Sequence, residues 1–94
     1  MNVQDTLAQR HDTHGEFVDN AEASQTLKKV IRDHIKVLIS YAQMEALDAI
    51  CGKIARIITG DPNHTDSWHD IAGYATLIER ELNKPVKEIN NDNI

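Results

Sequence analysis

Apolar residues recur every three or four positions in three stretches of the chain, a spacing typical of amphipathic helices. The expected helices cover about residues 15–33, 41–59 and 66–83. No stretch shows the sustained alternation of apolar and polar residues that a half-buried strand requires. The pattern therefore predicts an all-α fold, a small helical bundle with three principal helices.

The middle stretch carries the widest apolar surface of the three. Its apolar positions are Met44, Leu47, Ile50, Cys51, Ile54, Ala55, Ile57 and Ile58. One neighbouring helix does not cover a surface of this width, and large exposed apolar patches mark contact surfaces. We therefore expect a homo-oligomer.

Local signals set the ends of the second and third helices. Ser40 is expected to cap the middle helix and Gly60 to end it. Residues 61–65 contain a turn, after which Asp66 or Thr65 is expected to cap the third helix.

The chain divides into one helical domain and two polar ends. The domain is expected to span residues 15–83. Residues 1–14 predict either an arm or a short helix, and residues 84–94, rich in Asn, Asp and Lys, predict a flexible C-terminal tail.

The overall charge restricts the possible partners. A net charge of −5 and a pI of about 5.4 repel nucleic acid and anionic membranes, so we expect no bulk DNA or RNA binding and no membrane binding. No apolar run is long enough to span a bilayer, and the only cysteine, Cys51, cannot form an internal disulfide. These features favour a cytoplasmic protein whose phosphate-bearing partners are held by a local basic cluster.

Two of the expected helices carry a glycine beside carboxylates. Gly52 lies near Asp48, and Gly73 lies one turn after Asp70. Glycine inside a helix costs about 1 kcal/mol relative to Ala, so its presence suggests the close approach of a backbone or a ligand. We expect the two glycine-bearing sides to face each other and to enclose a bound anion.

The carboxylates of these helices are candidate metal ligands. Glu45 and Asp48 are three residues apart, and Asp66 and Asp70 are four apart, so each pair lies on one side of its helix. If the helices pack antiparallel, the four side chains converge and offer the oxygen ligands that Mg²⁺ prefers. Alternatively, Asp66 is a helix cap, Asp70 stands where it does because an acidic residue stabilises a helix N-terminus, and Glu45 and Asp48 are solvated.

Basic and aromatic residues supply candidate contacts to a phosphate-bearing ligand. Lys53, Arg56 and Lys28 are the candidate phosphate contacts. Alternatively, Lys28 extends from the edge of a core to water, and the other two form intrahelical pairs with acids. Further candidate contacts are Trp68, Tyr74 and His14. The histidines, which lack the paired spacing of a zinc site, are His11, His14, His34, His64 and His69.

Several of these segments resemble known families. Residues 45–48 (EALD) and 66–74 (DSWHDIAGY) resemble the signature of MazG-like all-α nucleoside triphosphate pyrophosphohydrolases. Residues 13–17 (THGEF), 53–57 (KIARI) and 70–74 (DIAGY) resemble a family of small phage and prophage proteins of unassigned function, over about residues 10–82.

The resemblance to the MazG-like family implies an activity and a set of catalytic residues. That family holds Mg²⁺ with two acid pairs and cleaves nucleoside triphosphates to monophosphate and pyrophosphate as dimers or tetramers. Glu45 and Asp48 match the first pair and Asp70 matches the last aspartate, which makes these three the implied catalytic residues. The sequence departs from the pattern at Ser67, where the family has glutamate, and Asp66 is one residue out of register.

Three functions follow as expectations. The first is a nucleotide-binding protein with Mg²⁺-dependent cleavage of a nucleotide. The second is a non-catalytic phage anti-defence protein, in the host cytoplasm, that sequesters a nucleotide signal or binds a host defence protein. The third is a purely structural oligomer.

Overall fold

The computed structural model describes residues 2–85, and within residues 10–14 it describes the backbone only. The chain forms the helices α1 (Val3–His14), α2 (Phe17–His34), α3 (Tyr41–Thr59) and α4 (Thr65–Leu82). Residues 2–85 contain no strand, so the all-α prediction is confirmed. The expected count of three helices is wrong, because residues 3–14 add a fourth.

Helix α1 is fixed at both ends by local backbone chemistry. The backbone N–H of Asp5 donates to Asn2 Oδ1 at 2.8 Å, which caps the first turn. Gly15, with φ of +76°, ends the helix in the left-handed region. The sequence did not decide between an arm and a helix here, because the segment has little apolar surface to bury. Val3 and Leu7 remain exposed in the structure. Because Gly15 ends α1, α2 begins at Phe17 rather than at residue 15.

The bounds expected for the middle helix are confirmed. The Ser40 hydroxyl accepts a hydrogen bond from the Gln43 backbone N–H at 3.0 Å, and the Ser40 N–H donates to Gln43 Oε1 at 2.9 Å. This reciprocal capping box begins α3. At the other end the Gly60 N–H donates to the Arg56 carbonyl at 3.0 Å.

Helix α4 begins without a side-chain cap. Its N-cap residue is His64, whose side chain makes no capping hydrogen bond, so the expectation that Thr65 or Asp66 would be the cap is wrong. Instead, the Trp68 indole N–H donates to the Pro62 carbonyl at 2.8 Å and ties the preceding turn to the helix. The predicted tail lies outside the described residues except for its first two positions.

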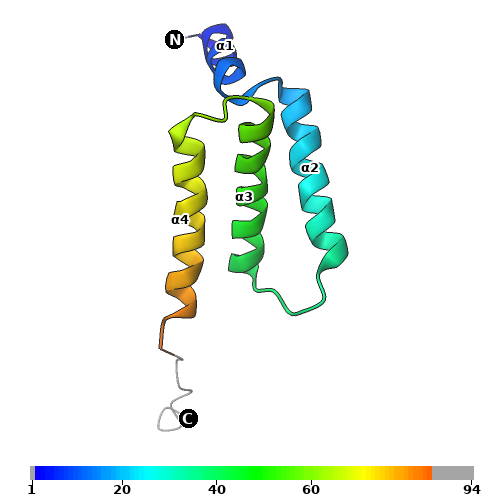
Figure 1. The fold of residues 1–94 in the computed structure, drawn as a ribbon, viewed down its shortest axis with the longest axis vertical. Coiled ribbons are helices and arrows are strands. Elements are labelled where there is room, and N and C mark those ends of the chain that lie inside the picture. The colour runs from blue at the N-terminus through cyan, green and yellow to red at the C-terminus, as the bar shows by residue number, and fades with distance from the viewer. Residues whose placement is uncertain (1, 86–94) are drawn as a thin grey trace.

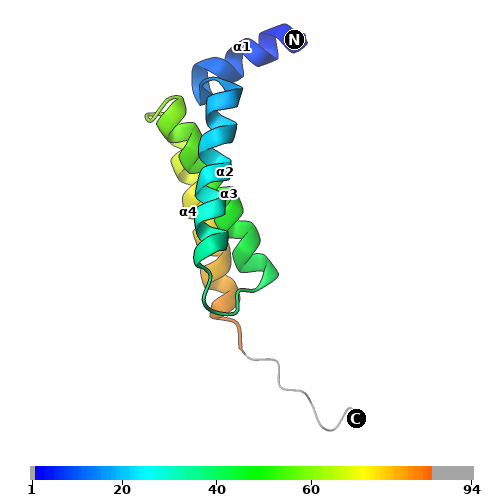
Figure 2. The same ribbon diagram turned by 90° about the vertical axis from the view of Figure 1, so that its right-hand side faces the viewer.

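Helices α2, α3 and α4 form one layer with α3 in the middle (Figures 1 and 2). Helix α3 packs against α2 on one side and against α4 on the other, antiparallel to both, whereas α2 and α4 do not contact each other in the described residues. Helix α1 crosses the end of the layer near the start of α2. The layer therefore has two broad faces that no other described helix covers.

The buried core is small, and apart from Ile57 its apolar residues are small ones on the two packed sides of α3. The apolar side chains less than one-tenth exposed are Ala46, Cys51, Ala55 and Ile57, all in α3. Ser24 of α2 and Ser67 of α4 are buried against them. Among the described residues no large side chain is fully buried. Small residues let the three helices approach closely, and the larger aliphatic side chains lie on the faces of the layer instead.

One face, which we call the apolar face, gathers most of these larger side chains. It consists of Leu27, Val30, Leu47, Ile50, Ile54, Ile58, Trp68, Ile71, Ala75, Ile78 and Leu82, which helical spacing places on the same side of the three helices. An open groove between α3 and α4 runs along it, lined by residues such as Leu47, Ile50 and Leu82. A second hollow joins Leu27 of α2 to Ile58 of α3.

Candidate functional site

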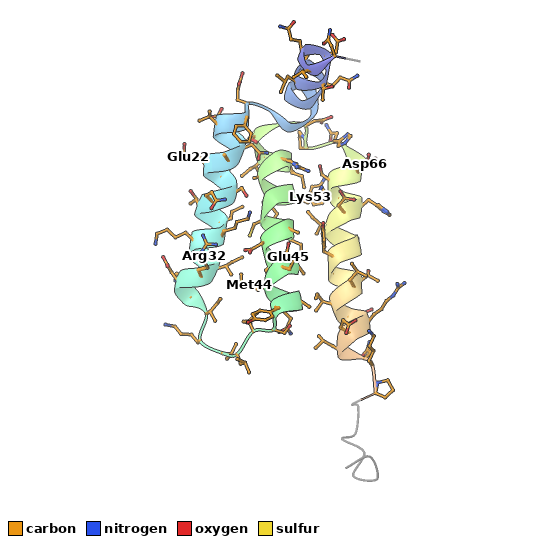
Figure 3. All side chains as sticks on the ribbon, turned by 180° about the vertical axis from the view of Figure 1, so that it is seen from behind. Glu22, Arg32, Met44, Glu45, Lys53 and Asp66 are labelled. Atoms are coloured by element: carbon orange, nitrogen blue, oxygen red, sulfur yellow. The ribbon has the colours of Figure 1, made fainter. Side chains whose placement is uncertain are left out.

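The opposite face of the layer, which we call the charged face, gathers most of the predicted site residues. It consists of Lys28, Arg32, Glu45, Asp48, Gly52, Lys53, Arg56, Asp70, Gly73, Tyr74 and Leu77, again by helical spacing. Figure 3 shows the molecule from this side, with Arg32, Glu45 and Lys53 labelled on the three-helix layer. The face brings cations and carboxylates of all three helices onto one surface.

An ion pair joins α3 to α4 on the charged face. Lys53 Nζ lies 2.8 Å from Asp70 Oδ2, with the Lys53 side chain only 19% exposed and that of Asp70 42% exposed. The hydrogen bond and charge of Lys53 lower the pKa of Asp70, with smaller contributions from His69 and Arg56. Three predicted site residues, Lys53, Arg56 and Asp70, are thus brought together.

A second group of charges lies between α2 and α3. Burial raises the pKa of the Cys51 thiol, the nearby Asp48 carboxylate adds to this, and Lys28 and Arg32 oppose it. The charges of Asp48 on α3 and of Lys28 and Arg32 on α2 thus all act on the Cys51 thiol. Asp48 Oδ1 is buried without a hydrogen-bond partner. Sequence reasoning missed Arg32, although its position four residues after Lys28 places it on the same side of α2.

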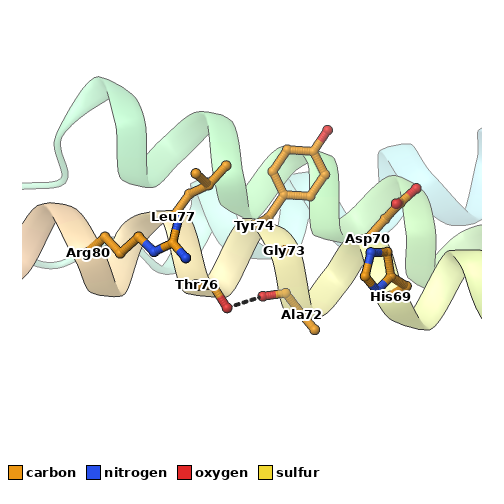
Figure 4. A pocket seen from close by; sticks show the side chains of 8 residues that line it. All are labelled: His69, Asp70, Ala72, Gly73, Tyr74, Thr76, Leu77 and Arg80. Carbon is orange, nitrogen blue, oxygen red and sulfur yellow. Dashed lines mark hydrogen bonds between the residues drawn. The ribbon is translucent and has the colours of Figure 1, made fainter.

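Gly52 and Gly73 do not face each other, so that expectation is wrong. A Cβ atom added at either residue would meet no other atom within 4 Å. The physical reason is that α2 and α4 pack on nearly opposite sides of α3, so residues between those sides point out of the layer. Both glycines instead open onto the charged face. Figure 4 shows Gly73 in a shallow hollow on α4, lined by residues such as His69, Tyr74 and Arg80.

The four predicted metal ligands are not gathered into one cluster. In residues 2–85 no group of three or more His, Cys, Asp or Glu side chains is placed to hold a metal ion. Asp66 is 81% exposed at the start of α4, and its carboxylate lies 3.8 Å from His64 Nε2. Asp70 is occupied by the Lys53 ammonium rather than by other acids. Within one chain these residues do not fit a resident Mg²⁺, and the magnesium expectation stays a prediction.

The aromatic candidates divide between the two faces. Tyr74 is partly exposed on the charged face, on the same side of α4 as Asp70 and Leu77 (Figure 4). Trp68 is 55% exposed on the apolar face, away from the other candidates. The side chain of His14 lies outside the described part of the structure.

The comparisons with known proteins identify a family but no activity. A family model described as a domain of unknown function, DUF6378, matches residues 3–82. No curated protein and no solved structure matches the chain. In the described residues no helix is long and apolar enough to cross a membrane. The matched range runs from α1 to the last residue of α4, and the chain therefore belongs to the DUF6378 family of domains of unknown function.

Proposed function

We propose that the charged face binds a phosphate-bearing small molecule of the nucleotide class. The observation that carries the proposal is the open surface at Gly52, which is flanked on its own helix by Lys53 and Arg56 and is not filled by any side chain. Across the α2–α3 contact, Lys28 and Arg32 add two further cations. Several cations on one face of an acidic chain form the local basic cluster that an anionic ligand needs.

The Lys53–Asp70 pair gives this surface a defined starting geometry. An ammonium has three donors, and the ion pair with Asp70 uses one of them, so a phosphate oxygen can be bound by another. Arg56 supplies a forked guanidinium that matches two phosphate oxygens. The ring of Tyr74 offers a flat surface on which a base can stack. Ligand binding thus uses residues from both α3 and α4, which the ion pair already holds together.

Calorimetric titration with nucleoside mono-, di- and triphosphates and with cyclic nucleotides tests the proposal. It is run once with chelator and once with Mg²⁺. The Lys53→Ala variant should weaken binding at least tenfold. Lys29→Ala is the matched control, because Lys29 is also paired with an acid, Asp33, but lies 71% exposed on the outer side of α2. Equal loss in both variants, or no binding of any of these compounds to the wild-type chain, would refute it.

A second candidate is the Mg²⁺-dependent pyrophosphohydrolase implied by the MazG-like resemblance. It is favoured by the unpartnered buried oxygen of Asp48, which has Glu45 three residues away on the same helix. Nucleotide turnover with Mg²⁺, abolished by Asp48→Asn, would support it. Tight binding without turnover would instead support the non-catalytic alternative, a protein that sequesters a nucleotide signal.

Only the resemblance supports a phage origin, an anti-defence role and a host defence protein as partner. A homo-oligomer, by contrast, is also supported by the small core, because a layer with no fully buried large side chain in its described part leaves apolar surface to cover.

A further inference from the structure

Within residues 2–85, no helix covers the apolar face. Its members on three different helices are more than half exposed: Val30 52%, Ile58 65%, Trp68 55% and Leu82 68%. The α3 residues at its centre, Leu47, Ile50, Ile54 and Ile58, are all aliphatic. A continuous apolar surface over a whole layer is the inner side of a larger helical assembly rather than a solvated surface.

The surface area of the chain agrees with a missing neighbour. The chain exposes 7606 Å², whereas a compact monomer of 10.6 kDa exposes about 5,500 Å². Each partner in a standard-size protein interface loses about 800 Å². The difference of about 2,100 Å² between the two areas is therefore more than enough surface for one such interface on each copy.

The acidic residues beside the apolar face favour a protein partner over a lipid surface. Asp19 and Glu22 lie beside Leu27 and Ile58 at the α2 edge of the face. Helices that lie on anionic membranes carry Lys and Arg at this position, and carboxylates would be repelled. A second copy of the chain supplies an apolar surface of the same size, because a two-fold axis pairs a patch with itself.

We propose that two copies pair through their apolar faces, layer against layer, with the α3 helices at the centre. This pairing buries Ile58, Trp68 and Leu82, and it leaves both charged faces on the outside of the dimer. Each dimer then presents two separate charged faces, one on each side. The pairing does not depend on the proposed ligand, so it can be tested without one.

Sedimentation equilibrium over a micromolar concentration series tests the pairing. The wild-type chain should sediment at twice its 10.6 kDa mass. Ile58→Arg should raise the dimer dissociation constant at least 100-fold, because it places a charge in the pairing surface. Leu77→Arg is the matched control, since Leu77 is 55% exposed but lies on the charged face, and it should leave the dimer intact. If Leu77→Arg dissociates the dimer and Ile58→Arg does not, the contact lies on the charged face, and the proposal is overturned.

Fluorescence of the only tryptophan gives a readout that needs no variant. Trp68 lies on the apolar face, so quenching by iodide should fall severalfold as wild-type protein is concentrated through the dimer transition. A wild-type monomer at micromolar concentration, or a dimer in which iodide still reaches Trp68 as in the monomer, would overturn the proposal. If Ile58→Arg fails to fold, this measurement still decides.

Discussion

The two faces of the helical layer are built from the same three helices but carry opposite chemistry. The apolar face presents aliphatic side chains and Trp68, whereas the charged face presents paired ions, two glycines and Tyr74. In the part of the chain that the structure describes, no further helix covers either face. The difference shows how a layer one helix thick separates two tasks: one face supplies the apolar area that a small core lacks, and the other keeps its polar groups accessible to a ligand.

Three glycines also differ from one another, in how closely other atoms of the fold surround them. A Cβ at Gly52 or Gly73 meets open space, whereas a Cβ at Gly15 would lie 1.9 Å from the carbonyl oxygen of Thr59. Gly15 is therefore required by the fold, and the other two glycines are not. Substitutions at these positions separate residues that the fold needs from residues that a ligand needs.

The largest effect is expected from Gly15→Ala. The substitution forces a positive φ on a residue with a side chain and drives Cβ into the backbone at the end of α3, so we expect a loss of about 2–4 kcal/mol of unfolding free energy. Chemical denaturation measures it. A loss below that of an ordinary surface substitution would contradict the contact between this turn and α3.

Ala55→Leu probes the thin core that separates the two faces. Ala55 is 0% exposed, so the larger side chain must push α2 away from α3, at a cost of about 1–3 kcal/mol. Ala75→Leu, on the exposed part of the apolar face, is the control and should change the stability of the single chain little. Urea denaturation monitored by helical circular dichroism compares the two, and equal losses would show that the layer is not packed as described.

Gly52→Ala should have opposite effects on stability and on binding. Alanine meets nothing within 4 Å and has the higher helix propensity, so the chain should gain about 0.5–1 kcal/mol. If the ligand lies against this surface, nucleotide affinity should fall at the same time. Thermal melts and calorimetry on the same sample measure both, and a stabilised variant with unchanged affinity would remove Gly52 from the site.

The smallest effect is expected from the charge on Lys53. Because the folded-state pKa of Asp70 lies below the ordinary value of 3.8, the ion pair stabilises the fold above about pH 4, and this contribution is lost as pH falls through the lowered pKa. Lys53→Met keeps the packed stem and removes the charge, so the fall in melting temperature on the acid side should be shallower. Parallel curves for the variant and the wild-type chain would show that the pair adds nothing to stability.

Much of the fold could be predicted from local patterns. The helical periodicity, the Ser40 cap and the Gly60 stop gave the bounds of α3 because such signals act within one turn of the backbone. The predicted bounds of α2 and α4 differ from the observed ones by one or two residues, because Gly15 ends α1 and the N-cap residues are Glu16 and His64. Helix α1 was not decided, since its weak apolar pattern gives no packing signal and only Asn2 and Gly15 define it.

The candidate site was predicted in composition but not in shape. Helical spacing alone placed Glu45, Gly52 and Arg56 on one side of their helix, and Asp70 and Gly73 on one side of theirs. Whether these sides meet depends on the angle between α2 and α4 around α3, which is set by contacts of residues far apart in the sequence. The expected enclosed pocket is therefore an open face, and Lys53 pairs with Asp70 instead of several carboxylates sharing a metal.

The sequence by itself determined the helices, their amphipathic sides and the types of charged residue that share each side, because all of these follow from the period of the α-helix. Only the tertiary structure decided that the three helices lie in one layer, since that arrangement depends on small side chains such as Ala46, Cys51 and Ala55 allowing α3 to pack on both sides at once. With α3 in the middle, the apolar and charged sides of all three helices are aligned on opposite faces.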